Sequence, residues 1–132
     1  MEEHIERLRL AYEGFGRTGE WPDADLLAPD FELHQDAFLD SAKVFRGADA
    51  PAELMGRLAQ AFRDVTVAAD ELLQAPDGRV VALIRTVAHG RGSGTEVQRR
   101  QAHVWTFADG TAIRMMIYER PNEALAAVGL AD

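Results

Sequence analysis

The stretch that decides the fold is EVQRRQAHVWTFADGTAIRMMIY, from Glu96 to Tyr118. It contains two runs rich in β-branched and aromatic residues, and they are separated by a turn sequence at Ala108–Gly110. The pattern predicts a β-hairpin. Because strand side chains alternate between the two faces of a sheet, the first run places a mixed apolar and polar set on one face: Gln101, His103, Trp105 and Phe107.

Two registers of this hairpin remain open from the sequence. In the first, Ala108–Gly110 form a three-residue loop, so His103 lies opposite Met115 and its face continues as Ile113, Met115 and Ile117. In the second, a two-residue Asp-Gly turn places His103 opposite Met116 and joins its face to Arg114 and Tyr118. We favour the first register because it produces one strongly apolar face.

Composition predicts one ordinary domain over residues 1–132. A chain of this length buries about two-thirds of the surface that its unfolded form exposes, so it needs no covalent staple. The absence of cysteine excludes structural disulfides and thiol catalysis. A hydrophobic content of 47% with 27% charged residues argues against disorder.

The net charge and the first residues of the sequence limit the classes of partner that we expect. A net charge of −8 weighs against nucleic acid, which favours a basic surface, and we interpret Arg91, Arg99 and Arg100 as solvated strand ends. The opening MEEHIERLRL lacks the basic and apolar regions of a signal peptide, and no apolar run approaches the roughly 20 residues that span a bilayer. We therefore expect a cytoplasmic protein that binds neither membrane nor nucleic acid.

Periodicity predicts the other elements in chain order. An amphipathic helix is expected near residues 2–17, since Ile5, Leu8, Tyr12 and Phe15 form one stripe. A short helical turn at 25–28, a strand at 31–36 and a loop at 37–50 follow. A second helix is expected from Pro51 to Val65, then strands at 66–73 and 79–89, the hairpin, and a final helix at 122–128 with Asn122 as N-cap.

This order predicts the α+β class. Strands joined by tight turns build a curved antiparallel sheet, and helices on one side cover its concave face. The order also resembles the SnoaL-like branch of the nuclear transport factor 2-like superfamily, which includes ketosteroid isomerases and limonene epoxide hydrolases. Four segments carry the resemblance: LLAPDFELHQD, FRGADAPAELMGRLAQAF, GRVVALIRTVAHGRGSG and AHVWTFADGTAIRMMIYERPNEALAAVGL.

The resemblance implies a cone-shaped, cystatin-like fold, in which the sheet wraps around the N-terminal and central helices and opens at one end to a mostly apolar pocket. It also implies a homodimer formed through the outer sheet face. Activity does not follow from this fold, because the superfamily includes isomerases, cyclases, hydrolases and proteins that only bind or associate.

Three residues are candidates for acid–base chemistry. Asp36 lies near the position at which ketosteroid isomerases carry their general base, a carboxylate that takes a proton from the carbon next to a carbonyl. His34 precedes it by two residues, so the two side chains are expected to point the same way, about 7 Å apart. His103 falls where SnoaL-type cyclases carry a pocket histidine. For each one the alternative is structural: an exposed strand-end carboxylate for Asp36 and hydrogen-bonded core histidines for the other two.

One departure from the cyclases is clear. They carry a catalytic aspartate in the last strand, and the nearest position here is Ile117, which cannot move a proton. This departure leaves Asp36, with His34 or His103, as the evident acid–base set. Limonene epoxide hydrolases use an Asp-Arg-Asp set, which Asp36, Arg85 and Arg114 do not reproduce.

The resemblance assigns the cavity lining to a set of large apolar side chains: Tyr12, Phe15, Trp21, Met55, Leu58, Phe62, Trp105, Met115 and Ile117. Trp21 precedes Pro22 in a loop and is expected to act as a lid, whereas core packing is the simpler role for Leu58 and Phe62. Tyr118 is expected to face outward. Trp and Met suit a flat apolar ligand.

Metal binding is a weaker hypothesis, based on His34, Asp36, His89 and His103. The glycines at 90, 92 and 94 join two strands, so we interpret them as a hairpin turn and not as a phosphate-binding loop. The sequence therefore predicts a cofactor-independent isomerase or cyclase acting on a hydrophobic small molecule. The alternative is a non-catalytic domain for binding hydrophobic ligands or for association.

Overall fold

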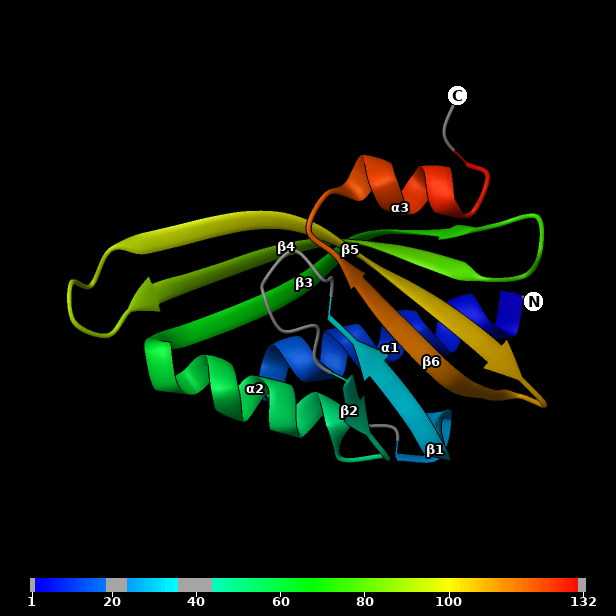
Figure 1. The fold of residues 1–132 in the computed structure, drawn as a ribbon, viewed down its shortest axis with the longest axis horizontal. Helices are drawn as coiled ribbons and strands as arrows, with labels where there is room; N and C mark the ends of the chain where they lie inside the picture. The colour runs from blue at the N-terminus through cyan, green and yellow to red at the C-terminus, as the bar shows by residue number, and fades with distance from the viewer. Residues whose placement is uncertain (1, 19–23, 36–43, 131–132) are drawn as a thin grey trace.

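The computed structural model describes residues 2–18, 24–35 and 44–130. Within these ranges the chain forms three α-helices, one 3-10 turn and six strands (Figure 1). In chain order they are α1 (Glu2–Thr18), η1 (Ala24–Leu26), β1 (Leu27–His34), β2 (Val44–Arg46), α2 (Ala50–Ala61), β3 (Phe62–Gln74), β4 (Val80–Gly90), β5 (Glu96–Ala108), β6 (Thr111–Tyr118) and α3 (Pro121–Ala127). No helix in these ranges is both long enough and apolar enough to cross a bilayer.

The strands form one open sheet in the order β2-β1-β6-β5-β4-β3. Strands β3 to β6 are sequential antiparallel neighbours joined by turns, as the sequence predicts. The sheet is mixed and not wholly antiparallel, because β1 lies parallel to β6. This pairing joins strands from opposite ends of the chain, so local turn signals do not reveal it. The α+β class is confirmed.

Helices pack on both faces of the sheet. Helix α1 contributes Leu8, Ala11 and Tyr12 to the main core, where they pack against Phe31, Trp105 and other inward side chains. Helix α3 packs on the opposite face, where Ala124 and Val128 cover Val81 and Val104. Figure 1 shows α1 and α2 on one side of the sheet and α3 on the other. The expected concave cover therefore comes from α1 and α2, and α3 covers part of the outer face.

The favoured hairpin register is wrong in its pairing. Its predicted inner face is right for Met115 and Ile117, which line the same cavity as His103, and wrong for Ile113, which is exposed. Ala108 pairs with Thr111 across a two-residue turn, because Asp109 and Gly110 both take positive φ (52° and 82°). A β-bulge then leaves Ile113 unpaired between Ala112 and Arg114. This extra residue shifts the pairing by one, so His103 lies opposite Ile117 and Trp105 opposite Met115.

Some element limits also differ from the sequence predictions. Helix α2 ends at Ala61, so Phe62 belongs to β3, where it pairs with Gly90. The expected loop at 37–50 contains the short strand β2, which pairs with the end of β1. Helix α3 begins at Pro121 with Arg120 in the cap position, and not with Asn122. In each case a tertiary pairing or an earlier proline overrides the local pattern.

The hairpin turn gives the first prediction. Gly110→Ala is expected to lower the free energy of unfolding by about 1–2 kcal/mol, because a Cβ atom disfavours the left-handed conformation of this residue. Gly92→Ala is the matched control: it lies in the β4–β5 turn, its φ is not in the left-handed region, and an added Cβ meets open space. Urea denaturation compares the two variants. Equal losses would contradict the two-residue turn.

Candidate functional site

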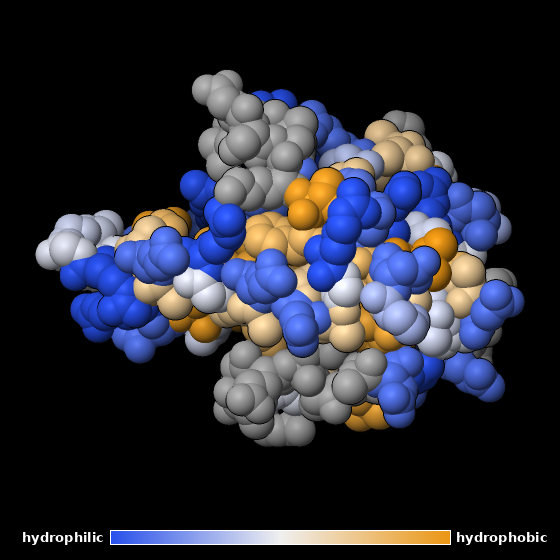
Figure 2. All heavy atoms as spheres, turned by 60° about the horizontal axis from the view of Figure 1, so that its bottom comes forward, coloured by the Kyte–Doolittle hydropathy of each residue, from blue (hydrophilic) through white to orange (hydrophobic). Residues whose placement is uncertain are grey.

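A cavity of about 960 Å³ lies between the inner face of the sheet and helices α1 and α2. Strands β4, β5 and β6 supply one wall, and α2 supplies the facing wall through Leu54, Met55 and Leu58. In the view that brings the bottom of Figure 1 forward, hydrophobic groups gather near the middle of the face between hydrophilic side chains (Figure 2). The volume is sufficient for a drug-sized ligand.

Most of the residues that were expected to line the cavity do so. They are Tyr12, Phe15, Met55, Leu58, Phe62, Trp105, Met115 and Ile117. Trp21 lies outside the described residues. Met55, Leu58 and Phe62 are only half-buried, since they face the cavity and not a packed neighbour. For Leu58 and Phe62 this position differs from the core packing considered from sequence.

Three buried side chains form a hydrogen-bonded chain at the inner end. The Trp105 indole Nε1–H donates to the Tyr12 hydroxyl oxygen at 2.9 Å. The same oxygen lies 2.6 Å from His103 Nδ1. The exposed fractions are 1% for Trp105, 5% for Tyr12 and 8% for His103. Helix α1 and strand β5 are therefore joined by hydrogen bonds inside an apolar core. Buried polar groups lower the stability of a fold unless they are hydrogen-bonded, as these groups are.

Burial sets the protonation of these groups. It lowers the pKa of His103 to about 3, so the imidazole is neutral at physiological pH. It raises the pKa of the Tyr12 hydroxyl, which therefore keeps its proton, although the hydrogen bond from Trp105 opposes this shift. The inner end of the cavity thus carries an uncharged histidine that can exchange hydrogen bonds but holds no positive charge.

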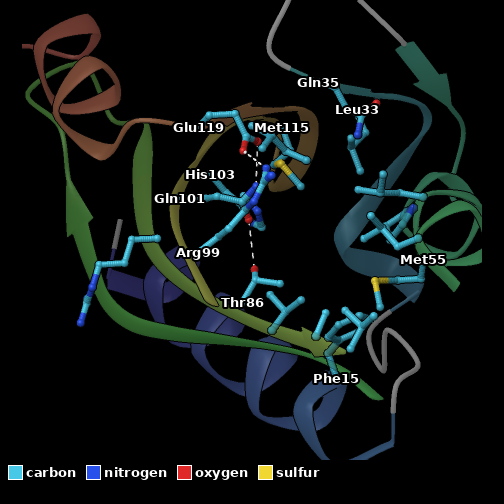
Figure 3. Close-up of a pocket in the computed structure, with 18 of the residues that line it drawn as sticks. Phe15, Leu33, Gln35, Met55, Thr86, Arg99, Gln101, His103, Met115 and Glu119 are labelled. Atoms are coloured by element: carbon cyan, nitrogen blue, oxygen red, sulfur yellow. Dashed lines mark hydrogen bonds and ion pairs between the residues drawn. The ribbon is translucent and has the colours of Figure 1, made fainter. Parts of the chain in front are cut away.

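A second polar network lies beside His103 and is more exposed to solvent. The Glu119 carboxylate accepts hydrogen bonds from Gln101 Nε2 at 2.7 Å and from Arg99 Nη1 at 3.1 Å. The Thr86 hydroxyl in turn donates to Gln101 Oε1 at 3.0 Å. Figure 3 shows Arg99, Gln101, His103 and Glu119 gathered together, away from Met55 and Phe15. The cavity therefore has a polar side and an apolar side.

The structure describes two of the three expected catalytic residues and places them apart. His103 lines the cavity. His34 lies on the opposite face of β1 from the cavity-lining Leu33 and Gln35, and its Nε2 is 2.8 Å from Glu32 Oε1. Asp36 lies outside the described residues. The structure therefore does not bring His34 and His103 together.

Sequence reasoning missed the second network. Alternation from His103 places Gln101 and Arg99 on the cavity face, and alternation from Met115 and Ile117 places Glu119 there too. Only the position of Glu119 beside Gln101 depends on the register that pairs His103 with Ile117. The interpretation of Arg99 as a solvated strand end is correct in part, since its side chain is 62% exposed and yet forms an ion pair with Glu119.

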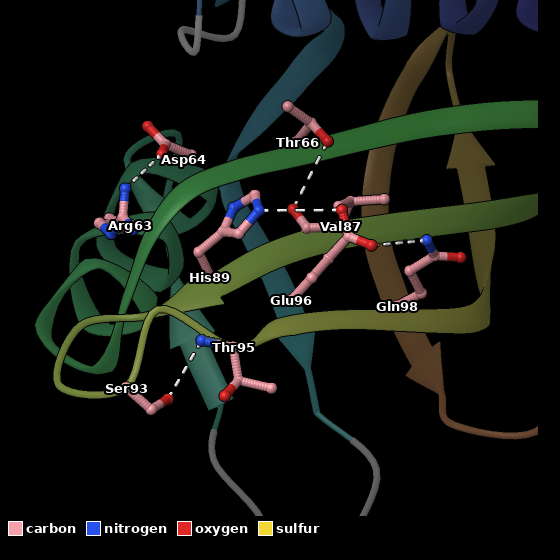
Figure 4. Close-up of polar contacts among 9 residues, drawn as sticks. All are labelled: Arg63, Asp64, Thr66, Val87, His89, Ser93, Thr95, Glu96 and Gln98. Atoms are coloured by element: carbon pink, nitrogen blue, oxygen red, sulfur yellow. Dashed lines mark hydrogen bonds and ion pairs between the residues drawn. The ribbon is translucent and has the colours of Figure 1, made fainter.

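The β4–β5 turn is held by local hydrogen bonds, and His89 lies just before it in β4. Ser93 Oγ accepts the Thr95 N–H at 3.1 Å, and the Gly94 N–H donates to the Gly90 carbonyl at 2.8 Å. The glycines thus form the expected hairpin turn. His89 Nε2 lies 3.8 Å from Glu96 Oε1 (Figure 4). Across the described ranges, no three His, Cys, Asp or Glu side chains are grouped to hold a metal ion.

One protein-family model matches most of the chain, and several solved structures have a similar fold. The SnoaL-like domain model matches residues 11–115. An NTF2-like protein of unknown function from Burkholderia pseudomallei is 20% identical, with 97% of this chain and 98% of that chain covered and a TM-score of 0.73. A putative SnoaL-like polyketide cyclase from Jannaschia sp. is 22% identical, with 99% and 94% covered and a TM-score of 0.70.

A third similar structure is the epoxide hydrolase/cyclase-like enzyme SalBIII of pyran ring formation in the polyether salinomycin. It is 16% identical, with 89% of this chain and 90% of that chain covered and a TM-score of 0.69. A search of curated proteins gives no match. The identities to these structures are low, so the shared feature is the fold.

The buried histidine predicts a pH dependence. The unfolded chain protonates His103 near pH 6.5, whereas the folded chain keeps it neutral down to about pH 3. The unfolded state therefore gains a proton as the pH falls from about 7 to 5, which lowers the free energy of unfolding by about 2 kcal/mol. His103→Gln removes this contribution, so its acid loss is expected to be smaller by about that amount. Urea denaturation across this range measures both, and parallel curves would contradict the assignment.

Proposed function

Because this chain belongs to the SnoaL-like domain family, we propose that it is a cofactor-independent enzyme of the isomerase or cyclase type. Its substrate would be an apolar small molecule that reacts by acid–base chemistry. One observation supports this most: a large cavity with an apolar wall brings a neutral histidine and a carboxylate to the same side. These are the two groups that proton transfer at carbon next to a carbonyl requires.

Glu119 is the candidate base among the described residues. It lies on the cavity face of the sheet two residues beyond Ile117, the partner of His103, so it is a diagonal cross-strand neighbour of that histidine. The side chains of such neighbours start about 7–8 Å apart, close enough for one small substrate to touch both. Asp36 remains the alternative base proposed from sequence.

The proposed reaction conserves atoms and charge. The carboxylate removes a proton from the carbon next to the substrate carbonyl, and the enolate oxygen that forms is stabilised by a hydrogen bond from His103. In an isomerisation, the carboxylic acid returns the proton to a different carbon. In a cyclisation, the enolate carbon attacks a second carbonyl of the same molecule, and the resulting alkoxide takes the proton.

A specific observation favours a second candidate function, the binding of a hydrophobic ligand without catalysis. Each oxygen of the Glu119 carboxylate is already hydrogen-bonded, one to Arg99 and one to Gln101. Both carboxylate oxygens are therefore already engaged by protein groups. Catalysis by Glu119 requires that substrate binding displace one of them.

Two of the similar structures support a ring-forming or ring-opening role. One is a putative polyketide cyclase and the other an epoxide hydrolase/cyclase-like enzyme.

Association of two copies through the part of the outer sheet face that α3 leaves uncovered remains part of the proposal.

Deuterium exchange tests the enzyme proposal without knowledge of the natural substrate. A β,γ-unsaturated steroid ketone and an aromatic 1,3-diketone are incubated in D₂O with the protein, and their mass is followed. We expect faster deuterium uptake with the wild type, and a reduction on the order of 100-fold in Glu119→Gln, because the amide cannot accept the proton. His34→Gln, on the other face of the sheet, is the control and should keep the rate.

The other outcomes discriminate between the proposals. Loss of uptake in Asp36→Asn with normal uptake in Glu119→Gln would make Asp36 the base and overturn the assignment of Glu119. A ketone that raises the melting temperature of the protein but gains no deuterium above background would contradict catalysis and favour the binding function.

A further inference from the structure

We propose that Tyr12, held by Trp105, is a positioning residue that fixes the tautomer of His103 with the proton on Nε2. The cavity then presents an N–H donor at this point, and the ligand must bring an acceptor oxygen to it, such as a carbonyl, an ether or an epoxide. This inference deepens the proposed function and names the group of the ligand that His103 recognises.

The geometry starts from the indole. An indole N–H can only donate, so the 2.9 Å contact between Trp105 Nε1 and the Tyr12 oxygen has one possible direction. It occupies an acceptor position on the phenol oxygen. It also draws charge from that oxygen, which makes the phenol hydroxyl a stronger donor to its next neighbour.

The next neighbour is His103 Nδ1, at 2.6 Å. Two directions are possible for this contact: the phenol donates to an unprotonated Nδ1, or a protonated Nδ1 donates to the phenol oxygen. The first is favoured because a phenol O–H is a much stronger acid than a neutral imidazole N–H. It also lets each group in the chain donate once, from Trp105 to Tyr12 and from Tyr12 to His103.

His103, the last group of this hydrogen-bonded series, then faces the ligand. His103 lines the cavity and its Nδ1 is engaged by Tyr12, so Nε2 is the ring nitrogen that a ligand can reach. In a neutral imidazole that accepts at Nδ1, the proton resides on Nε2. The inner end of the cavity is therefore a donor site, and the carboxylate of Glu119 beside it is the acceptor site.

This division gives the cavity a polarity that a ligand must match. A carbonyl oxygen would lie at His103 and the adjacent C–H at Glu119, with the apolar body of the ligand against Met55 and Leu58. A hydrocarbon of the same shape would leave the Nε2–H without an acceptor in a dry site, and this desolvation cost reduces its affinity. The preference is therefore for oxygenated ligands, whichever base acts.

Nitrogen-15 NMR of histidine-labelled protein tests the tautomer directly. We expect His103 Nδ1 to show the chemical shift of an unprotonated nitrogen and Nε2 that of a protonated one. The proton between Tyr12 and His103 should show no one-bond splitting by labelled Nδ1, because it belongs to oxygen. His103→Gln identifies the signals. A proton with one-bond splitting on Nδ1 would overturn the proposal.

Two tyrosine variants separate positioning from general stability. Tyr12→Phe removes the donor with almost no change in shape, so the bridging proton should disappear and the Nδ1 shift should move. Tyr118→Phe changes the outward tyrosine of β6, which packs in the outer cluster, and should leave the His103 signals unchanged. An unchanged His103 spectrum in Tyr12→Phe would contradict a positioning role.

The ligand preference has its own test. Fluorenone and fluorene have nearly the same shape and differ at one carbon, which is a carbonyl in fluorenone and a CH₂ group in fluorene. We expect fluorenone to bind the wild type about tenfold more tightly, and this ratio to fall toward one in His103→Phe. Equal affinities in the wild type would overturn the donor site. Neither result depends on turnover, so failure of the enzyme proposal would leave this inference to be judged on its own.

Discussion

The register of β5 against β6 is the constraint on which the rest of the site depends. A turn with two residues at positive φ and a bulge at Ile113 together place Trp105 opposite Met115 and His103 opposite Ile117. Side chains alternate with a period of two, so a slip of one residue would turn the whole set toward the outer face. The two irregularities therefore decide which groups reach the cavity.

The same register joins the two halves of the polar wall. It brings Glu119 beside Gln101 and makes it a diagonal neighbour of His103, while Tyr12 reaches His103 from α1. One part is buried and uncharged, and the other is more exposed and contains the Arg99–Glu119 ion pair. A site with these two environments can donate a hydrogen bond at one point and accept a proton at another, which is the division that acid–base catalysis uses.

The sequence predicted the architecture because the information for it is local. The stripe on α1, the turn residues and the alternation in β5 each specify a neighbour nearby in the chain. The parallel pairing of β1 with β6 and the bulge at Ile113 depend on packing between distant segments, so no short pattern reveals them. The place of Glu119 beside Gln101 also depends on this register, although alternation from Met115 and Ile117 already directs Glu119 to the cavity face.

The position of His34 could have been recognised earlier. Phe31 and Leu33 alternate with Glu32 and His34, and the apolar pair is fully buried. A strand that buries its apolar residues in the core directs the intervening polar ones to the other face, whichever motif they resemble. For His34 this alternation is a better guide than its spacing from Asp36, on which the catalytic hypothesis was based.

The central claim is that the cavity receives an apolar molecule with its oxygen directed to the polar wall. A crystal structure of the protein with bound fluorenone tests this most directly. The account predicts the ketone oxygen within about 3 Å of His103 Nε2, a hydrogen-bond distance, and the rings against Met55 and Leu58. A cavity filled by protein side chains, or a ketone bound with its oxygen toward α2, would contradict it.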